Sequence, residues 1–350
     1  MFTRLATPLG WLRGISADPV SVRVMRLALG VTISVALAYG IEWPLAFLLP
    51  VLTGVLLSLP LPMPSLPGGL RNMLHSLMAF GIGLVFSLFF INFPLAYLLM
   101  LGLVLFHLYY YLNRGGSLWF TLMSMIAILL LPMLANTAEG LATGLALGFI
   151  GTSWLTMIMV WISHLLVPDP VRGRLPPRPG FQPGYSSVAA KTALKSTVVI
   201  FPLASLFIIF DLMDFLLVMI FSAIFILKPE LSKGREAGQN SLISTILGGL
   251  CAWLFYMLIV AVPQYHFFVV LMFFTTLVFG MIIFSTRPTA KYYGSALSAL
   301  LVLINGSMGS DADFSTLFVQ RIALIVLAVV YIVAVLKVLD SYWPAKPQQA

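Results

Sequence analysis

The sequence has few of the residues on which soluble proteins depend. It contains one cysteine, Cys251, so no internal disulfide can form, and only 9% of its 350 residues are charged. Its four histidines are scattered and form no cluster with metal-ligand spacing. A mean hydropathy of +1.05 leaves too little polar surface to cover a soluble globule. We therefore expect an integral membrane protein with no metal site, no cofactor and no enzymatic activity.

Apolar runs of the length that spans a bilayer follow one another along the chain. They lie at 22–41, 43–60, 72–91, 94–112, 117–134, 140–167, 189–210, 212–227, 239–262, 266–286, 291–308 and 316–339. The short gaps near Asn92 and Pro263 also allow ten or eleven spans. The sequence thus predicts an all-α polytopic membrane protein with about twelve transmembrane helices.

The basic residues alternate with these runs in one consistent way. The side of the membrane that holds both termini also holds the basic residues of the loops, among them Arg4, Arg13, Arg23, Arg26, Arg71, Arg114, Arg172, Lys195, Lys228, Arg287 and Lys337. The opposite side holds Glu42, Glu139, Asp211, Asp214, Asp311 and Asp313, with Arg321 as its one basic candidate. Cytoplasmic loops carry the excess of Lys and Arg. The net charge of +8 is therefore topological and not a nucleic-acid footprint, and both termini are expected in the cytoplasm of a bacterial cell.

The chain also repeats itself at an offset of 169 residues, which later drifts to 173. Arg26 then aligns with Lys195 and Glu42 with Asp211, and the loop "LPLPMPSLPGGLRN" aligns with "LKPELSKGREAGQN". Because each copy holds an even number of spans, we expect two parallel six-helix repeats, an organisation typical of transporters.

These patterns divide the chain into five parts. They are a cytoplasmic interfacial segment at 1–21, a first transmembrane repeat at 22–167, a cytoplasmic proline-rich linker at 168–188, a second repeat at 189–340 and a cytoplasmic tail at 341–350.

Several of these stretches resemble one known family. The first span "RVMRLALGVTISVALAYGIEWP", the loop ending "GGLRN", and "STRPTAKYYGSAL" at 285–297 look like the fusaric acid resistance and aromatic acid exporter superfamily, most like its compact uncharacterised branch. Larger members carry a soluble domain where this chain has only the linker. The resemblance implies an inner-membrane exporter of small aromatic or other organic acids that works with a periplasmic membrane-fusion adaptor.

Titratable groups within spans are the default functional candidates, because burying charge in a membrane is costly. Arg321, about five residues into the last span, could bind a substrate carboxylate, or could instead reach the headgroups or pair with Asp311 or Asp313. His107 suits proton coupling, but a hydrogen-bonded packing histidine or an interfacial histidine is the favoured alternative.

Pairs matched between the repeats give two further candidates. Arg26 and Lys195 could form a cationic cytoplasmic entrance, or could simply anchor topology. Glu42 and Asp211 could exchange protons, or could be ordinary acids of short loops and helix N-termini.

Helix breakers suggest where a substrate could bind. Pro50 and Pro132 interrupt the second and fifth spans, and Asn305 aligns with Pro132, so we expect the substrate path there; ordinary kinks are the alternative. Gly140, Gly144 and Gly148 offer a small-residue packing face that suits a homo-oligomer.

An ion-gradient-driven exporter fits these features best. No convergent acid, base or nucleophile set indicates an enzyme. The sequence leaves open a non-transporting scaffold or assembly subunit of a larger complex.

Overall fold

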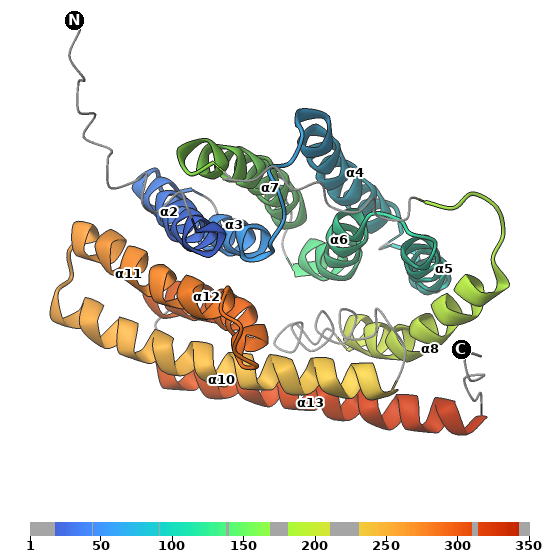
Figure 1. Cartoon of the computed structure of the whole chain (residues 1–350). Helices are drawn as coiled ribbons and strands as arrows, with labels where there is room; N and C mark the ends of the chain where they lie inside the picture. The colour runs from blue at the N-terminus through green and yellow to red at the C-terminus, as the bar shows by residue number, and fades with distance from the viewer. Residues whose placement is uncertain are drawn as a thin grey trace, which may run out of the picture. The chain divides into compact units, whose positions relative to one another are not determined.

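The structure is a computed structural model that describes residues 18–43, 45–90, 92–137, 140–168, 181–210, 231–309 and 314–342. This part of the chain is all-helical and holds no strand. Its helices are α2 (Pro19–Gly40), α3 (Leu48–Ser58), α4 (Leu66–Phe90), α5 (Pro94–Asn113), α6 (Leu118–Thr137), α7 (Leu141–Leu166), α8 (Ser187–Ile209), α10 (Leu231–Ala261), α11 (Tyr265–Ile283), α12 (Ala290–Gly309) and α13 (Phe314–Tyr342) (Figure 1). Each expected run except 212–227, which lies outside the described residues, coincides with one of them. The all-α prediction is therefore confirmed.

Eight of the described helices are long and apolar enough to cross a membrane. Three more apolar stretches, Leu48–Ser58, Ala290–Ile304 and Val330–Leu339, are shorter than a full span. Because a bilayer core needs about 20 apolar residues per helix, these lengths indicate a multi-pass membrane protein.

Two helices begin earlier in the chain than the sequence predicted. The polar stretch 228–240 was expected to be a loop, but residues 231–240 form the beginning of α10. Likewise α4 begins at Leu66, six residues before the expected span. The start of α10 contains Lys233, Arg235, Glu236 and Gln239, which are good helix formers outside lipid, and α4 has Pro67 in its first turn, where proline is tolerated.

The helix starts follow local sequence signals. Asp18 caps α2: its carboxylate accepts hydrogen bonds from the backbone N–H groups of Val20 and Ser21 at 3.1 and 3.2 Å. Pro19 occupies the first helical position, where its missing N–H costs nothing. At α8 the Ser186 hydroxyl accepts a hydrogen bond from the Ala189 N–H at 3.3 Å.

The chain forms two compact units that interleave along the sequence. Unit 1 comprises Met1–Gly69, Thr152–Pro176 and Ile243–Leu317; unit 2 comprises Leu70–Gly151, Pro177–Leu242 and Phe318–Ala350. Unit 1 thus holds α2, α3, α11, α12 and parts of α7 and α10, whereas unit 2 holds α5, α6, α8 and most of α4 and α13.

In unit 1, α2 packs against α3 and α11, and α12 packs against α3 and α11. The rings of Tyr39 and Phe268 join α2 to α11 with centroids 5.4 Å apart. Close approach elsewhere depends on small residues: a Cβ on Gly248 of α10 would overlap the backbone carbonyl oxygen of Ala296 in α12. No side chain larger than hydrogen fits there.

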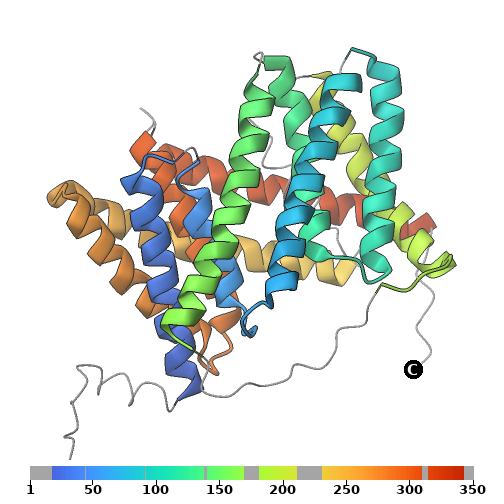
Figure 2. The ribbon, with the colours of Figure 1, turned by 90° about the horizontal axis from the view of Figure 1, so that it is seen from above.

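In unit 2, α5 packs against α6 and α8, and α6 also contacts α8. Both views show α4, α5 and α6 grouped together (Figures 1 and 2). A Cβ on Gly83 of α4 would come within 2.6 Å of the Ala127 Cβ in α6. The Tyr331 hydroxyl of α13 donates a 2.6 Å hydrogen bond to the Val199 carbonyl of α8. The core of unit 2 forms between these helices and includes Leu101, Leu105, Tyr109, Ile128 and Ile200.

Candidate functional site

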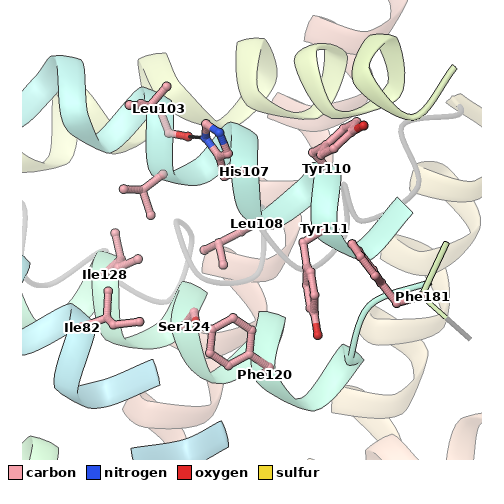
Figure 3. A pocket seen from close by; sticks show the side chains of 11 residues that line it. Ile82, Leu103, His107, Leu108, Tyr110, Tyr111, Phe120, Ser124, Ile128 and Phe181 are labelled. Atoms are coloured by element: carbon pink, nitrogen blue, oxygen red, sulfur yellow. Dashed lines mark hydrogen bonds between the residues drawn. The ribbon is translucent and has the colours of Figure 1, made fainter. Parts of the chain in front are cut away.

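Unit 2 contains a cavity of about 500 Å³. Its walls come from α4, α5, α6 and the residue Phe181, which precedes α8 (Figure 3). Because the lining comes from three helices and the segment before a fourth, the cavity depends on the tertiary packing of the unit.

One end of this pocket is aliphatic. Ile82 of α4, Leu103 of α5 and Ile128 of α6 gather there, apart from the tyrosines, and His107 lies beside Leu103 (Figure 3). Ile128 is fully buried, whereas Ile82 is 48% and Leu103 49% exposed. The remainder of unit 2 therefore leaves this end open between α4 and α5.

The other end of the pocket is aromatic. The Tyr111 ring lies 5.6 Å from the Phe181 ring and meets the Phe120 ring edge-on at 5.7 Å. On its other side Phe120 lies 5.5 Å from the imidazole of His75. Such ring pairs fix one another's orientation and leave flat apolar faces for a planar ligand.

Arg114, which follows the last residue of α5, lies beside this aromatic end. Its guanidinium carbon lies 5.8 Å from the Tyr110 ring centre and 5.9 Å from that of Phe181. Its Nη1 donates a long, 3.4 Å hydrogen bond to the Tyr110 hydroxyl. Only 7% of the residue is exposed, and its buried Nε has no hydrogen-bond partner.

No acid pairs with Arg114 among the side chains that the structure describes. Asp18 and Glu42 are the acids described there, and both belong to unit 1. A buried cation needs a partner because desolvation is costly, and two aromatic faces compensate for only part of that cost. Arg114 does not line the pocket itself, so it places a buried positive charge behind the lining residues Tyr110 and Phe181.

The segment that carries Phe181 is attached to the end of α5. The Gln182 N–H donates to the Arg114 carbonyl at 3.1 Å, and the Ser186 N–H donates to the Tyr110 hydroxyl at 3.1 Å. Gly184 between them has φ +104°, a conformation that residues with a Cβ rarely adopt. These contacts hold Phe181 against Tyr111 and Arg114.

Two more polar side chains line the pocket. Ser124 of α6 is 2% exposed, and its Oγ has no hydrogen-bond partner. His107 of α5 is exposed, and its Nδ1 lies 2.8 Å from the Leu103 carbonyl oxygen. Because a carbonyl only accepts, this geometry places the proton on Nδ1 and leaves Nε2 as the basic nitrogen.

Of the side chains selected from the sequence, His107 lines this pocket, and its proton-coupling role stays a prediction. Arg114 was counted only among the topological charges. The signal that could have identified it is "YYYLNRG" at 109–115, where three tyrosines lie within five residues before the arginine.

The expected entrance residues lie in different units. Arg26 of α2 is buried and donates from Nε and Nη2 to the Val167 carbonyl oxygen at 3.0 and 2.8 Å, next to the end of α7. Lys195 is half-buried on α8 in unit 2. Glu42 is exposed between α2 and α3 with φ 50°, and Asp211 lies outside the described residues.

The expected substrate-path residues are also divided. Pro50 is buried in α3 of unit 1, and Pro132 is buried in α6 of unit 2. Asn305 belongs to α12 and Arg321 to α13, but their side chains lie outside the described part.

A protein-family model described as "Protein of unknown function (DUF2955)" matches residues 23–163. The chain is thus similar to that family over most of the expected first repeat. No curated protein and no solved structure matches the chain. The family description carries no activity, so the chemistry of the pocket is the guide to function.

Proposed function

We propose that this multi-pass membrane protein exports small organic acids, aromatic acids among them, across the bacterial inner membrane, with both termini in the cytoplasm. The observation that carries the proposal is the aromatic pocket of unit 2 with the buried Arg114 beside it. Flat rings and a desolvated guanidinium complement the two parts of an aromatic carboxylate.

The packing of the two units supports a duplicated, transporter-like architecture. In the repeat alignment α2 corresponds to α8, α4 to α10, α5 to α11 and α6 to α12. The α2–α11 contact of unit 1 then corresponds to the α8–α5 contact of unit 2, and the α11–α12 contact to the α5–α6 contact. Each unit would then combine helices from both halves of the chain, because each half contributes helices to both units.

Small residues repeat this correspondence. Gly83 of α4 packs against Ala127 of α6, as Gly248 of α10 packs against Ala296 of α12. In the repeat alignment Gly83 falls on Ala252, one helical turn after Gly248, and Ala127 falls on Leu300, one helical turn after Ala296. Both members of the second contact are thus displaced by one turn in the same direction. The close approach of α4 to α6 and of α10 to α12 therefore favours a repeated helix pair.

The pocket also fits export in its position along the chain. Arg114 ends a helix whose opposite end, Pro94, is expected on the periplasmic side. The acid group would then bind at the cytoplasmic end, where export begins. We propose an ion gradient as the energy source, His107 as a coupling residue, and a periplasmic adaptor and a second copy of the chain as partners.

An accumulation assay in cells tests the function. Cells that lack the protein receive wild type, Arg114→Gln or Arg71→Gln, and labelled benzoate accumulation is measured before and after collapse of the proton gradient. Arg71 is an exposed arginine of α4 in the same unit and on the same expected side, so it controls for lost charge.

We expect wild type and Arg71→Gln to lower accumulation until the gradient is collapsed, and Arg114→Gln to lose most of the effect. Equal accumulation with and without wild-type protein, across a panel of acids and at verified membrane levels, would refute export. That result would favour the scaffold function.

A further inference from the structure

The size of the pocket limits what fills it. Pockets for drug-sized ligands measure about 300–1,000 Å³. At about 500 Å³ this cavity lies within that range, so a one-ring acid would leave much of its apolar wall uncovered. Binding free energy grows with the apolar area removed from water, so a larger body binds more tightly.

The polarity of the pocket runs in one direction. Its cationic neighbour Arg114 lies at the aromatic end with Tyr110 and Phe181, whereas Ile82, Leu103 and Ile128 form the other end. A ligand that satisfies both ends has one acid group and an apolar body that extends away from it. A compact diacid would place its second charge beside Ile82 and Ile128, at a high desolvation cost, and of the lining side chains at this end only the exposed His107 could compensate for it.

The aliphatic end is also open. Ile82 and Leu103 are about half exposed, and both belong to helices long enough to span the membrane. The body of a bound ligand can therefore project between α4 and α5 without displacing side chains. Bulk is tolerated at this end and charge at the other.

We propose that the pocket binds planar, lipophilic monocarboxylates with a fused or multi-ring body, the carboxylate at Arg114 and the body between Ile82 and Leu103. The proposal rests on the proposed export function and narrows its substrates. The carboxylate lies at the aromatic end, where the positive charge of Arg114 behind Tyr110 and Phe181 attracts it, and the rings stack between the aromatic and aliphatic side chains.

Direct binding to the full-length protein in lipid nanodiscs tests this class. Equilibrium dialysis compares benzoate, 2-naphthoate and neutral 2-naphthamide, with empty nanodiscs correcting for partitioning into lipid. We expect 2-naphthoate to bind about tenfold or more tightly than benzoate, since the second ring removes further apolar area from water. Arg114→Gln should bind naphthoate and naphthamide equally.

A steric variant tests the position of the body independently of Arg114. Ile82→Trp narrows the open end. It should weaken the binding of 2-naphthoate and leave the binding of benzoate unchanged. Leu88→Trp is the matched control, because Leu88 is a similarly exposed residue, 52%, on the same helix, outside the pocket. It should behave as wild type.

Equal affinities for benzoate and naphthoate, or naphthoate binding that ignores Ile82→Trp, would overturn the proposal. If cells export benzoate but the protein neither binds nor exports naphthoate, the proposed ligand class is overturned, while the export function stands. If naphthoate binds with the expected pattern but cells export no acid, the ligand class stands and the export function fails.

Discussion

Replacement of Arg26 by Met should destabilise unit 1 by removing a cation that holds the end of α7. Arg26 is 4% exposed and directs two N–H groups at the Val167 carbonyl oxygen, at 3.0 and 2.8 Å. A hydrogen bond to a charged group contributes about 1.5–3 kcal/mol net. Because both donors share one acceptor, we count them as one strong interaction and expect a loss of about 2–3 kcal/mol.

Arg23→Met is the matched control. Arg23 lies one turn earlier on α2 and is only partly buried. Its replacement by Met removes the same charge from the same expected side of the membrane. It should change stability by about 0.5 kcal/mol or less, as is usual for a substitution that breaks no specific contact. Arg26→Lys should fall between the two, since it keeps the charge but loses the paired donors of the guanidinium.

Unfolding of the purified protein in mixed detergent micelles, followed by circular dichroism, gives the comparison. If Arg26→Met unfolds at the same denaturant concentration as Arg23→Met, the contact with Val167 contributes nothing and Arg26 acts only through its charge. If Arg26→Met is stable but cells lose acid export, Arg26 belongs to a cytoplasmic entrance and not to the frame of the unit.

Three further changes test other features. Gly248→Val should lower the stability of the protein by about 1–3 kcal/mol in the same unfolding assay, because its Cβ would overlap the Ala296 carbonyl oxygen. Gly81→Val, where a Cβ would have no atom within 4 Å, should be nearly neutral. Ser124→Ala should stabilise the ligand-free protein by about 1 kcal/mol in that assay, because it removes a buried hydroxyl without a partner; a loss of stability would show that the hydroxyl is hydrogen-bonded. Hydrogen exchange, corrected for intrinsic rates, should show that the first turn of α2 opens faster in Asp18→Ala than in wild type. In wild type the same turn should open faster as the pH falls through the pKa of Asp18. The hydrogen bond from the Ser21 hydroxyl, followed by those from the backbone N–H groups of Val20 and Ser21, lowers this pKa, so the cap is present above it and lost below it; Asp18→Asn should keep the cap at low pH.

The sequence predicted the helices well and their ends less well. Apolar length identifies a membrane helix because the bilayer sets that length, so the described helices coincide with the expected runs. Helix ends obey other rules. The second run was expected from residue 43, but α3 begins at Leu48, because Glu42 and Leu45 both adopt positive φ in the preceding turn.

The pocket could be predicted only in part, for a physical reason. His107 attracted attention because it is a lone titratable group within an apolar run, and it does line the cavity. The burial of Arg114 depends on Phe181, which lies far along the chain and reaches the arginine only after folding. Charge counts along a sequence register the side of the membrane on which a cation lies, but not whether a distant aromatic ring covers it.

Phe181 also makes the two halves of the chain chemically unequal. Arg287 aligns with Arg114 in the expected repeat, but it is exposed, whereas Arg114 is buried between Tyr110 and Phe181. The difference comes from the segment between the halves, since Gln182 and Ser186 of that segment bind Arg114 and Tyr110 directly. A duplicated frame would by itself place two similar cations at two similar helix ends. Phe181 covers Arg114, and under the proposed function this contact makes one half of the expected duplicated frame the binding site for the acid.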